Sequence, residues 1–212
     1  MSGSLVTLSG VGVRLGGHTV LRAIDLDVAA GEVIGLFGRN GAGKTTLLRV
    51  LASLIRPTTG RAEVLGVDVA GPEAVDVRGR IGYIGHTPGL YPELTLAENL
   101  EFAADVGGYD RSAATAALAA VGLAAAGVRR SSASSFGMQR RTEFARELMR
   151  APTLLLLDEP HSSLDRDAVD LVEALVARTV ADGGAAVLVS HDRDRVTAAA
   201  DRTTELEAGT LA

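Results

Sequence analysis

The sequence lacks cysteine entirely and has no long hydrophobic run in its 212 residues. The absence of cysteine excludes disulfides, thiolate zinc sites and thiol catalysis. No stretch approaches the roughly 20 continuous apolar residues that a membrane-spanning helix needs. Residues 1–10 have neither a basic start nor a long apolar run, so we expect no signal peptide. These absences predict a soluble protein that would act at a membrane only through a partner.

Positive charge is limited in amount and unusual in kind. The net charge is −5, whereas a nucleic-acid-binding surface requires a basic face, so we expect no nucleic-acid partner. Of the 21 basic residues one is lysine, Lys44, and the other 20 are therefore arginine. Lysine is a compact point charge and arginine a planar fork, so a single retained lysine indicates that a point charge is needed there.

Strand and helix patterns alternate at both ends of the chain. Ile24, Leu26 and Val28 alternate with aspartates, which is typical of a half-buried strand. Thr95 and Glu98 have the spacing of a helix-capping box at the start of a helical middle section. The pattern predicts an α/β fold with a mainly parallel sheet and a helical lobe. Further strands are expected at 5–8, 32–37, 81–84, 154–157 and 186–189, and helices at 44–54, 138–149 and 166–180.

The glycine-rich segment 38–45, Gly-Arg-Asn-Gly-Ala-Gly-Lys-Thr, fits the P-loop pattern G-x-x-x-x-G-K-[ST]. It lies between a predicted strand and a predicted helix, which is the context that supports a P-loop rather than a simple turn. Glycines let backbone N–H groups surround phosphate oxygens, and the helix N-terminus adds a favourable dipole. Lys44 would reach the β- and γ-phosphates, and Thr45 would ligate Mg²⁺. The predicted nucleotide-binding residues here are Arg39, Asn40, Gly41, Ala42, Gly43, Lys44, Thr45 and Thr46.

Two carboxylates follow the apolar strand at 154–157. Asp158 suits the coordination shell of Mg²⁺, and Glu159 suits orienting or deprotonating the attacking water. His191 follows the last predicted strand and could place an imidazole on the γ-phosphate as a second catalytic residue. A lone histidine at a strand end commonly has no role, but the location of His191 favours a function. His161 and His18 are interpreted as solvated surface residues.

The chain resembles the ATP-binding-cassette family over essentially its whole length, because further short motifs follow the P-loop in that family's order and spacing. The family's signature loop has a counterpart just before a predicted helix. Its D-loop and switch histidine have counterparts after the Asp-Glu pair, and a histidine stands at its glutamine-loop position. The residues that carry these matches are Ser135 and Gly137 for the signature loop, Ser163–Asp165 for the D-loop, His191 for the switch, and His86 for the glutamine loop.

The resemblance implies a P-loop NTPase core with N-terminal antiparallel strands and a helical signature lobe over about 87–150, all within a single domain, 1–212. It implies ATP and Mg²⁺ as cofactors, with Asp165 among the nucleotide contacts and His86 as a candidate metal ligand. Two chains would pair head to tail, with each ATP between one P-loop and the signature loop of the other chain. Hydrolysis would drive integral membrane permease subunits. The chain would then be cytoplasmic and peripheral at the inner face of the cell membrane.

Several positions depart from the family pattern. The signature usually reads Leu-Ser-Gly-Gly-Gln, but residues 134–138 read Ser-Ser-Phe-Gly-Met, which keeps the serine and second glycine. His86 replaces glutamine, and Leu15 stands near the usual adenine-stacking aromatic, which predicts weaker nucleotide affinity or base choice. Within the family, the chain looks like the haem-exporter ATPase of cytochrome c maturation. That likeness rests on Tyr83–His86, Pro88–Gly89, Glu93–Thr95 and Glu98–Leu100.

Three alternatives remain open at this stage. The chain could serve a transporter with a different cargo. It could be a soluble cassette machine, although translation-type members usually carry two cassettes and repair-type members a long coiled-coil insert. It could also bind nucleotide without hydrolysing it. The presence of all the expected hydrolysis residues argues against this alternative: Lys44, Asp158, Glu159 and His191.

Overall fold

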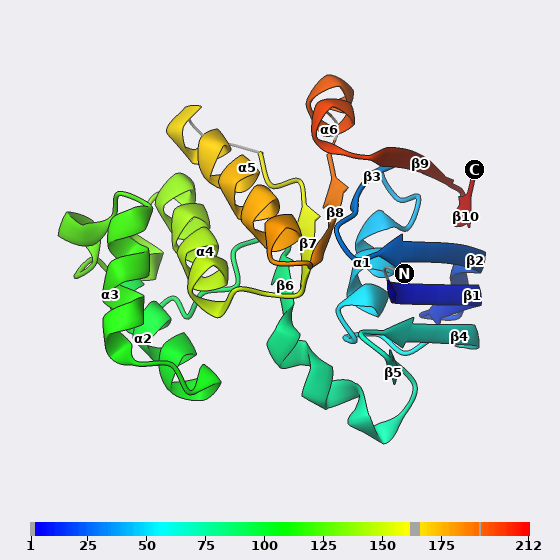
Figure 1. The fold of residues 1–212 in the computed structure, drawn as a ribbon, viewed down its shortest axis with the longest axis horizontal. Coiled ribbons are helices and arrows are strands. Elements are labelled where there is room, and N and C mark those ends of the chain that lie inside the picture. Colours follow the sequence, from blue (N-terminus) through cyan, green and yellow to red (C-terminus); the bar gives the residue numbers. More distant parts are fainter. Residues whose placement is uncertain (1–2, 162–165, 191) are drawn as a thin grey trace.

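The computed structural model describes residues 3–161, 166–190 and 192–212, with the backbone alone for 166–168. Figure 1 shows a helical lobe at one end, a parallel sheet in the middle and an antiparallel sheet at the other end. The strands are β1 (Ser4–Leu15), β2 (His18–Ala29), β3 (Val33–Phe37), β4 (Thr59–Val64), β5 (Val67–Asp68), β6 (Ile81–Ile84), β7 (Leu154–Asp158), β8 (Ala185–Val189), β9 (Arg202–Glu207) and β10 (Thr210–Leu211). The α-helices are α1 (Lys44–Leu51), α2 (Leu96–Gly107), α3 (Arg111–Ala120), α4 (Phe136–Arg150), α5 (Arg166–Ala181) and α6 (Arg193–Ala199), with 3-10 turns at Pro72–Arg80, Ala124–Ala126 and Ser131–Ala133.

The central sheet has six strands in the order β10-β9-β3-β8-β7-β6. All neighbouring pairs are parallel except β10 with β9. Both faces of this sheet are covered, which explains why β7 is a continuous apolar run. Leu154 and Leu156 pack toward α1 and the antiparallel sheet, whereas Leu155 and Leu157 pack with α5 and the helical lobe. The predicted α/β fold, with its mixed and mainly parallel sheet, is therefore confirmed.

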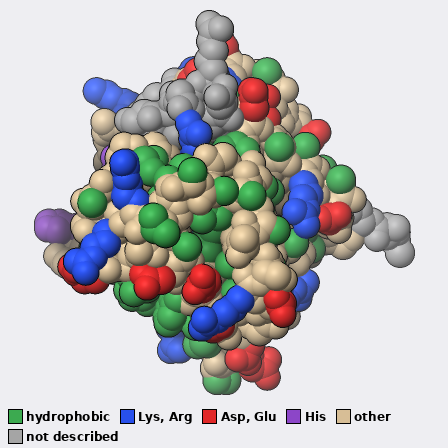
Figure 2. All heavy atoms as spheres, turned by 90° about the vertical axis from the view of Figure 1, so that its left-hand side faces the viewer, with side chains coloured by type: hydrophobic (Ala, Val, Ile, Leu, Met, Phe, Trp, Pro, Cys, Tyr) green, Lys and Arg blue, Asp and Glu red, His purple; other side chains and the backbone are tan. Residues whose placement is uncertain are grey.

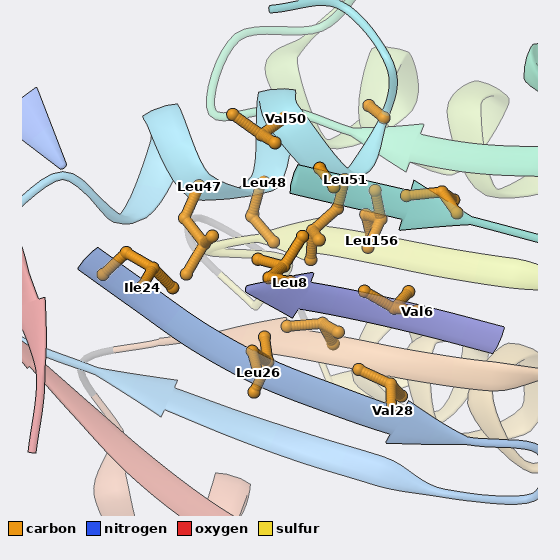
Figure 3. Close-up of a cluster of buried hydrophobic side chains, with 14 of the residues drawn as sticks. Val6, Leu8, Ile24, Leu26, Val28, Leu47, Leu48, Val50, Leu51 and Leu156 are labelled. Carbon is orange, nitrogen blue, oxygen red and sulfur yellow. The ribbon is translucent and has the colours of Figure 1, made fainter. Parts of the chain in front are cut away.

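The antiparallel sheet has the order β2-β1-β4-β5. Its β2 strand buries Ile24, Leu26 and Val28 and exposes the aspartates between them, as the alternation predicts. Figure 3 shows these side chains meeting Leu47, Leu48 and other residues of α1 in one apolar cluster. The packing fixes the start of α1 against two sheets, and the segment that precedes α1 carries the glycine-rich motif.

The helical lobe consists of α2, α3 and α4 (Figure 1). Thr95 caps α2, and both hydrogen bonds of the predicted capping box with Glu98 are present. Helix α4 begins at Phe136, two residues earlier than the sequence pattern indicates, because Ser135 accepts a hydrogen bond from the Met138 N–H at 3.3 Å. Among the described residues, no helix has the length and apolar character needed to cross a membrane.

Helix α1 is shorter than its sequence pattern predicts, and several elements have no clear sequence pattern. Helix α1 ends at Leu51, not at 54, because Ser53 takes a left-handed backbone and donates its hydroxyl to the Ala74 carbonyl at 2.6 Å. The short strands β4, β5 and β10, the strand β9 and the helix α6 carry no pattern strong enough to have been predicted.

Candidate nucleotide-binding site

A cavity of about 550 Å³ opens where the glycine-rich loop meets the carboxyl end of β7. It brings together residues from the loop, from α1, from the segment after β6 and from the end of β7, which lie far apart in the sequence. Of the residues predicted from sequence, the cavity gathers the loop, the carboxylate pair and His86. Its lining is Val20, Asn40, Gly41, Gly43, Lys44, Thr45, Thr46, His86, Asp158 and Glu159.

The loop needs glycine at two positions for steric reasons. Gly38 and Gly43 have φ values of 144° and 110°, which side chains rarely adopt. A Cβ atom at Gly38 would lie 2.3 Å from the Leu206 carbonyl oxygen, and one at Gly43 would lie 2.8 Å from Leu21. Gly43 is also the N-cap of α1 and provides no side-chain cap, so no side chain of the N-cap occupies the first-turn N–H groups of the helix at the edge of the cavity.

Lys44 lies almost fully buried at the first position of α1. Its ammonium group donates to the carbonyl oxygens of Gly38 at 2.6 Å and Arg39 at 3.1 Å. The chain's single lysine therefore holds the glycine-rich loop closed around itself. A compact ammonium fits among these carbonyls, and it can exchange them for phosphate oxygens at the same place.

Thr45 and Asp158 form the part of the cavity that suits a divalent cation. The Thr45 hydroxyl donates to Asp158 Oδ2 at 2.7 Å, and Asp158 is buried. Hydroxyl and carboxylate oxygens are the hard donors that Mg²⁺ prefers, with phosphates completing the shell. Within the described residues, no group of three His, Asp or Glu side chains is placed to hold a metal alone. The residues thus fit a cation that arrives with a phosphate ligand.

Glu159 follows the last residue of β7 and takes a left-handed backbone conformation with φ 53°. Its N–H donates to the Val189 carbonyl at 2.8 Å, which ties it to the neighbouring end of β8. A non-glycine residue in this region carries backbone strain, and such strain is concentrated at functional positions. The turn directs Glu159 into the cavity beside Asp158.

Other predicted site residues lie away from this cavity or outside the described structure. Ser135 and Gly137 sit at the N-terminus of α4 in the helical lobe and do not line the cavity. Within the loop itself, Ala42 is buried and Arg39 is exposed, and neither lines the cavity. Asp165 and His191 fall outside the described residues. Val20 lines the cavity from β2, and no sequence signal pointed to it.

The interpretation of His161 as a solvated residue is wrong. Both ring nitrogens are buried, and neither has a hydrogen-bond partner within the described part of the chain. His161 lies in a separate cavity of about 520 Å³ with α5 and α6, close to Arg195. Burial lowers the pKa of His161 below its ordinary 6.5, and the positive charge of Arg195 acts in the same direction. His18, by contrast, is exposed as expected.

Replacing His161 with phenylalanine should therefore not weaken the fold, because it removes a buried polar group that has no hydrogen-bond partner among the described residues. Because the pKa of His161 is lower in the folded than in the unfolded protein, protonation of this residue favours the unfolded state. The free energy of unfolding therefore carries no penalty from His161 above about pH 6.5 and declines as the pH falls below that value. In His161→Phe this part of the decline should disappear. Chemical denaturation at pH 7.5 and 5.5 measures both effects, and an unchanged pH dependence would contradict the lowered pKa.

Comparisons with known proteins show the family to which the chain belongs. The ABC transporter family profile matches residues 21–162. The chain is 36% identical over 195 residues to the cytochrome c biogenesis ATP-binding export protein CcmA 2 of Cupriavidus metallidurans, covering 91% of this chain and 92% of that protein. It is 39% identical to the daunorubicin resistance ATP-binding protein DrrA3 of Streptomyces coeruleorubidus, covering 99% of this chain and 67% of that protein.

Solved structures give the same class. A dimeric post-hydrolysis ATP-binding cassette bound to ADP and Pi is 26% identical, with a TM-score of 0.87 and coverage of 97% of this chain and 96% of that one. The fold and the cavity thus define a P-loop ATPase of the cassette type. The chain belongs to the ABC transporter family. It is an ATPase and the nucleotide-binding subunit of a transporter.

Proposed function

We propose that this subunit binds Mg²⁺-ATP in the cavity beside Lys44 and works as a head-to-tail dimer of single-domain chains. In this proposal Ser135 and Gly137 of each chain contact the nucleotide of the other. The work is done on separate integral membrane subunits at the inner face of the cell membrane, and the process is haem export in cytochrome c maturation. The observation that carries the proposal is the convergence of loop, carboxylate pair and His86 on one cavity.

Each side chain of the cavity has a task that its position supports. Lys44 exchanges the carbonyls of its own loop for phosphate oxygens, which neutralises the developing charge of phosphoryl transfer. Thr45 and Asp158 would hold the Mg²⁺ that accompanies ATP, which would neutralise phosphate charge there. Glu159 orients the attacking water and accepts its proton. Asp165 and His191 keep the roles that the family resemblance gives them, nucleotide contact and γ-phosphate contact.

Haem export is supported by several relatives and by one segment of the sequence. CcmA proteins of three further bacteria are 37–39% identical to the chain. The segment 81–102 carries the motifs that look like the haem-exporter ATPase, including His86 in place of glutamine. Transport of another cargo is the second candidate, because the methionine import protein MetN of Nocardia farcinica is 37% identical and the lipoprotein-releasing protein LolD of Roseobacter denitrificans 35%.

Co-purification separates these candidates. The tagged chain is expressed in its native cell, the membranes are solubilised gently, and the proteins that accompany the chain are identified. Small polytopic membrane subunits that bind haem would support the proposal. A polytopic partner that handles another compound would retain the transporter subunit and reject haem. Recovery from the soluble fraction without any membrane subunit would reject the membrane partner altogether.

A groove on the helical lobe suits the docking of such a partner. A cavity of about 410 Å³ lies between the segment after β6 and helix α2. Its rim includes Tyr91, Phe102 and Val106, which are 56%, 45% and 74% exposed, and the two aromatic rings meet edge to face at 5.1 Å. Figure 2 views the molecule from the lobe and shows hydrophobic side chains gathered on this face among charged ones. Exposed apolar groups of this size commonly mark a protein contact.

Replacing Phe102 with aspartate should therefore reduce recovery of the membrane subunits by about 10-fold or more, as for a central aromatic contact. ATP binding by the isolated chain should stay the same, because Phe102 is remote from the cavity that holds Lys44. Val128→Asp is a matched control, since Val128 is also exposed on the lobe but does not line the groove. Equal recovery of the subunits with Phe102→Asp and with the parent would contradict docking at this groove.

A further inference from the structure

Helix α4 buries a run of charged side chains along one face. Arg140, Glu143 and Glu147 are at most 1% exposed, and Arg146 and Arg150 are about one-fifth exposed. Arg140 pairs with Glu143 at 3.0 Å, and Glu147 pairs with Arg146 at 2.9 Å and with Arg150 at 3.1 Å. Charged groups are rarely buried unless every one of them is paired, so this face must meet a specific polar surface.

That surface is the backbone of the segment 85–89, which contains His86. Arg140 donates to the carbonyl oxygens of Gly85 at 2.6 Å and His86 at 2.8 Å. Glu143 accepts from the Gly89 N–H at 2.9 Å. The segment has no helix or strand of its own, so these side chains supply hydrogen bonds that regular structure would otherwise provide. Side chains of α4 thus fix the position of the His86 backbone.

The same helix begins at the signature loop. Ser135 is its N-cap, and the Phe136 ring lies 5.3 Å below the Arg140 guanidinium. Arg140 therefore touches both the first turn of α4 and the carbonyl of His86. Ser135 lies outside the cavity of its own chain, whereas His86 lines it. One buried guanidinium connects a residue at the nucleotide site of this chain with a loop proposed to contact the nucleotide of the other chain.

We propose that Arg140 and Glu143 are positioning residues that hold the signature loop and the segment 85–89 as one rigid body. His86 then moves with the helical lobe, and closure of the signature loop on the partner's nucleotide changes the place of His86 in its own site. The movement of His86 on closure rests on the proposed head-to-tail dimer. The rigid connection between the signature loop and the segment 85–89 lies within one chain and does not depend on the dimer. Coupling between two sites requires such an element with contacts to both.

The absence of native cysteine allows a direct test of the rigid connection. Thr87 lies in the segment 85–89, Ala133 lies next to the signature loop, and both are exposed. Cysteines introduced at these two positions would be the only attachment sites for nitroxide labels. Pulsed electron resonance then measures the distance between the labels with and without Mg²⁺-ATP. We expect one narrow distance that ATP does not change. A distance that shifts or broadens on adding ATP would overturn the proposal without any further variant.

The double variant Arg140→Met/Glu143→Leu removes the contacts while replacing a buried ion pair with apolar side chains, which folded proteins often tolerate. We expect the label distance to broaden and kcat to fall by about 2- to 30-fold, the usual range for coupling residues. The dissociation constant of ATP for the isolated chain should not change, because the P-loop is untouched. Arg140→Lys should restore part of kcat, since one ammonium can reach a carbonyl.

Arg111→Met/Asp105→Leu is the matched control, because it removes an exposed ion pair of the same lobe that touches neither segment. It should leave both the distance and kcat unchanged. A narrow distance and parental kcat in Arg140→Met/Glu143→Leu would overturn the proposal. If ATP gave no dimer in a Glu159→Gln background, the proposed dimer would fail, while the label distance within one chain would still decide whether the connection is rigid.

Discussion

Replacing Glu159 with glutamine is expected to lower ATP turnover by at least about 100-fold, which is the effect of removing a general base. Glutamine keeps the size and the hydrogen-bonding oxygen of glutamate but cannot accept the proton of the attacking water. Binding of Mg²⁺-ATP should persist, because Lys44, Thr45 and Asp158 remain in place. With hydrolysis blocked, the ATP-bound dimer should accumulate.

Phosphate release measures the turnover, and size-exclusion chromatography with Mg²⁺-ATP measures the dimer. Glu63→Gln is a suitable control, since Glu63 is an exposed strand residue paired with Arg61 and lies outside the cavity. It should match the parent in both measurements. If Glu159→Gln hydrolysed ATP at the parental rate, the assignment of the catalytic carboxylate would be wrong. If it lost hydrolysis but stayed monomeric, the head-to-tail dimer would be wrong.

Replacing Lys44 with arginine should weaken Mg²⁺-ATP binding by about 10- to 100-fold, the range for losing a hydrogen bond to a charged group in a buried site. The charge is retained, but the planar guanidinium is larger and does not fit between the carbonyls of Gly38 and Arg39 that enclose the ammonium. Turnover at saturating ATP should fall as well, because the guanidinium cannot take the position of the ammonium on the transferring phosphate.

Titration with a fluorescent ATP analogue gives the affinity of each variant. The reverse exchange at an exposed site, Arg61→Lys, tests whether the chain tolerates the two cations elsewhere and should have no effect. Parental affinity in Lys44→Arg would show that a point charge is not required, and the single lysine of the sequence would then have no functional meaning.

The motifs that depend on local spacing could be predicted from the sequence. The loop at 38–45 required only its flanking strand and helix, and the capping box of α2 required only Thr95 and Glu98. The five-residue strand at Leu154 could be placed because its residues are buried on both faces of the sheet. Each of these features is encoded within a few consecutive residues, and the physical reason for each acts over the same short range.

Features that depend on distant partners could not be predicted. The arginines of α4 appear in the sequence as one face of an amphipathic helix, which would ordinarily be solvated. Arg140 is instead buried, because carbonyls more than fifty positions earlier in the chain accept its hydrogen bonds. The burial of His161 could not be predicted for the same reason, since residues of α5, α6 and two strands line the cavity that holds it. No pattern near Val20 indicates that a strand of the other sheet completes the cavity.

The backbone conformation at Glu159 affects which amino acids suit this position. A left-handed conformation is strained for glutamate, whereas glycine adopts it without a steric penalty, so glycine at 159 would relieve this strain. Backbone geometry alone would therefore favour glycine over the side chain that we propose activates water. The proposed catalytic role gives glutamate at this position a function that offsets the strain, and a chain that did not hydrolyse ATP would have no such reason to keep it.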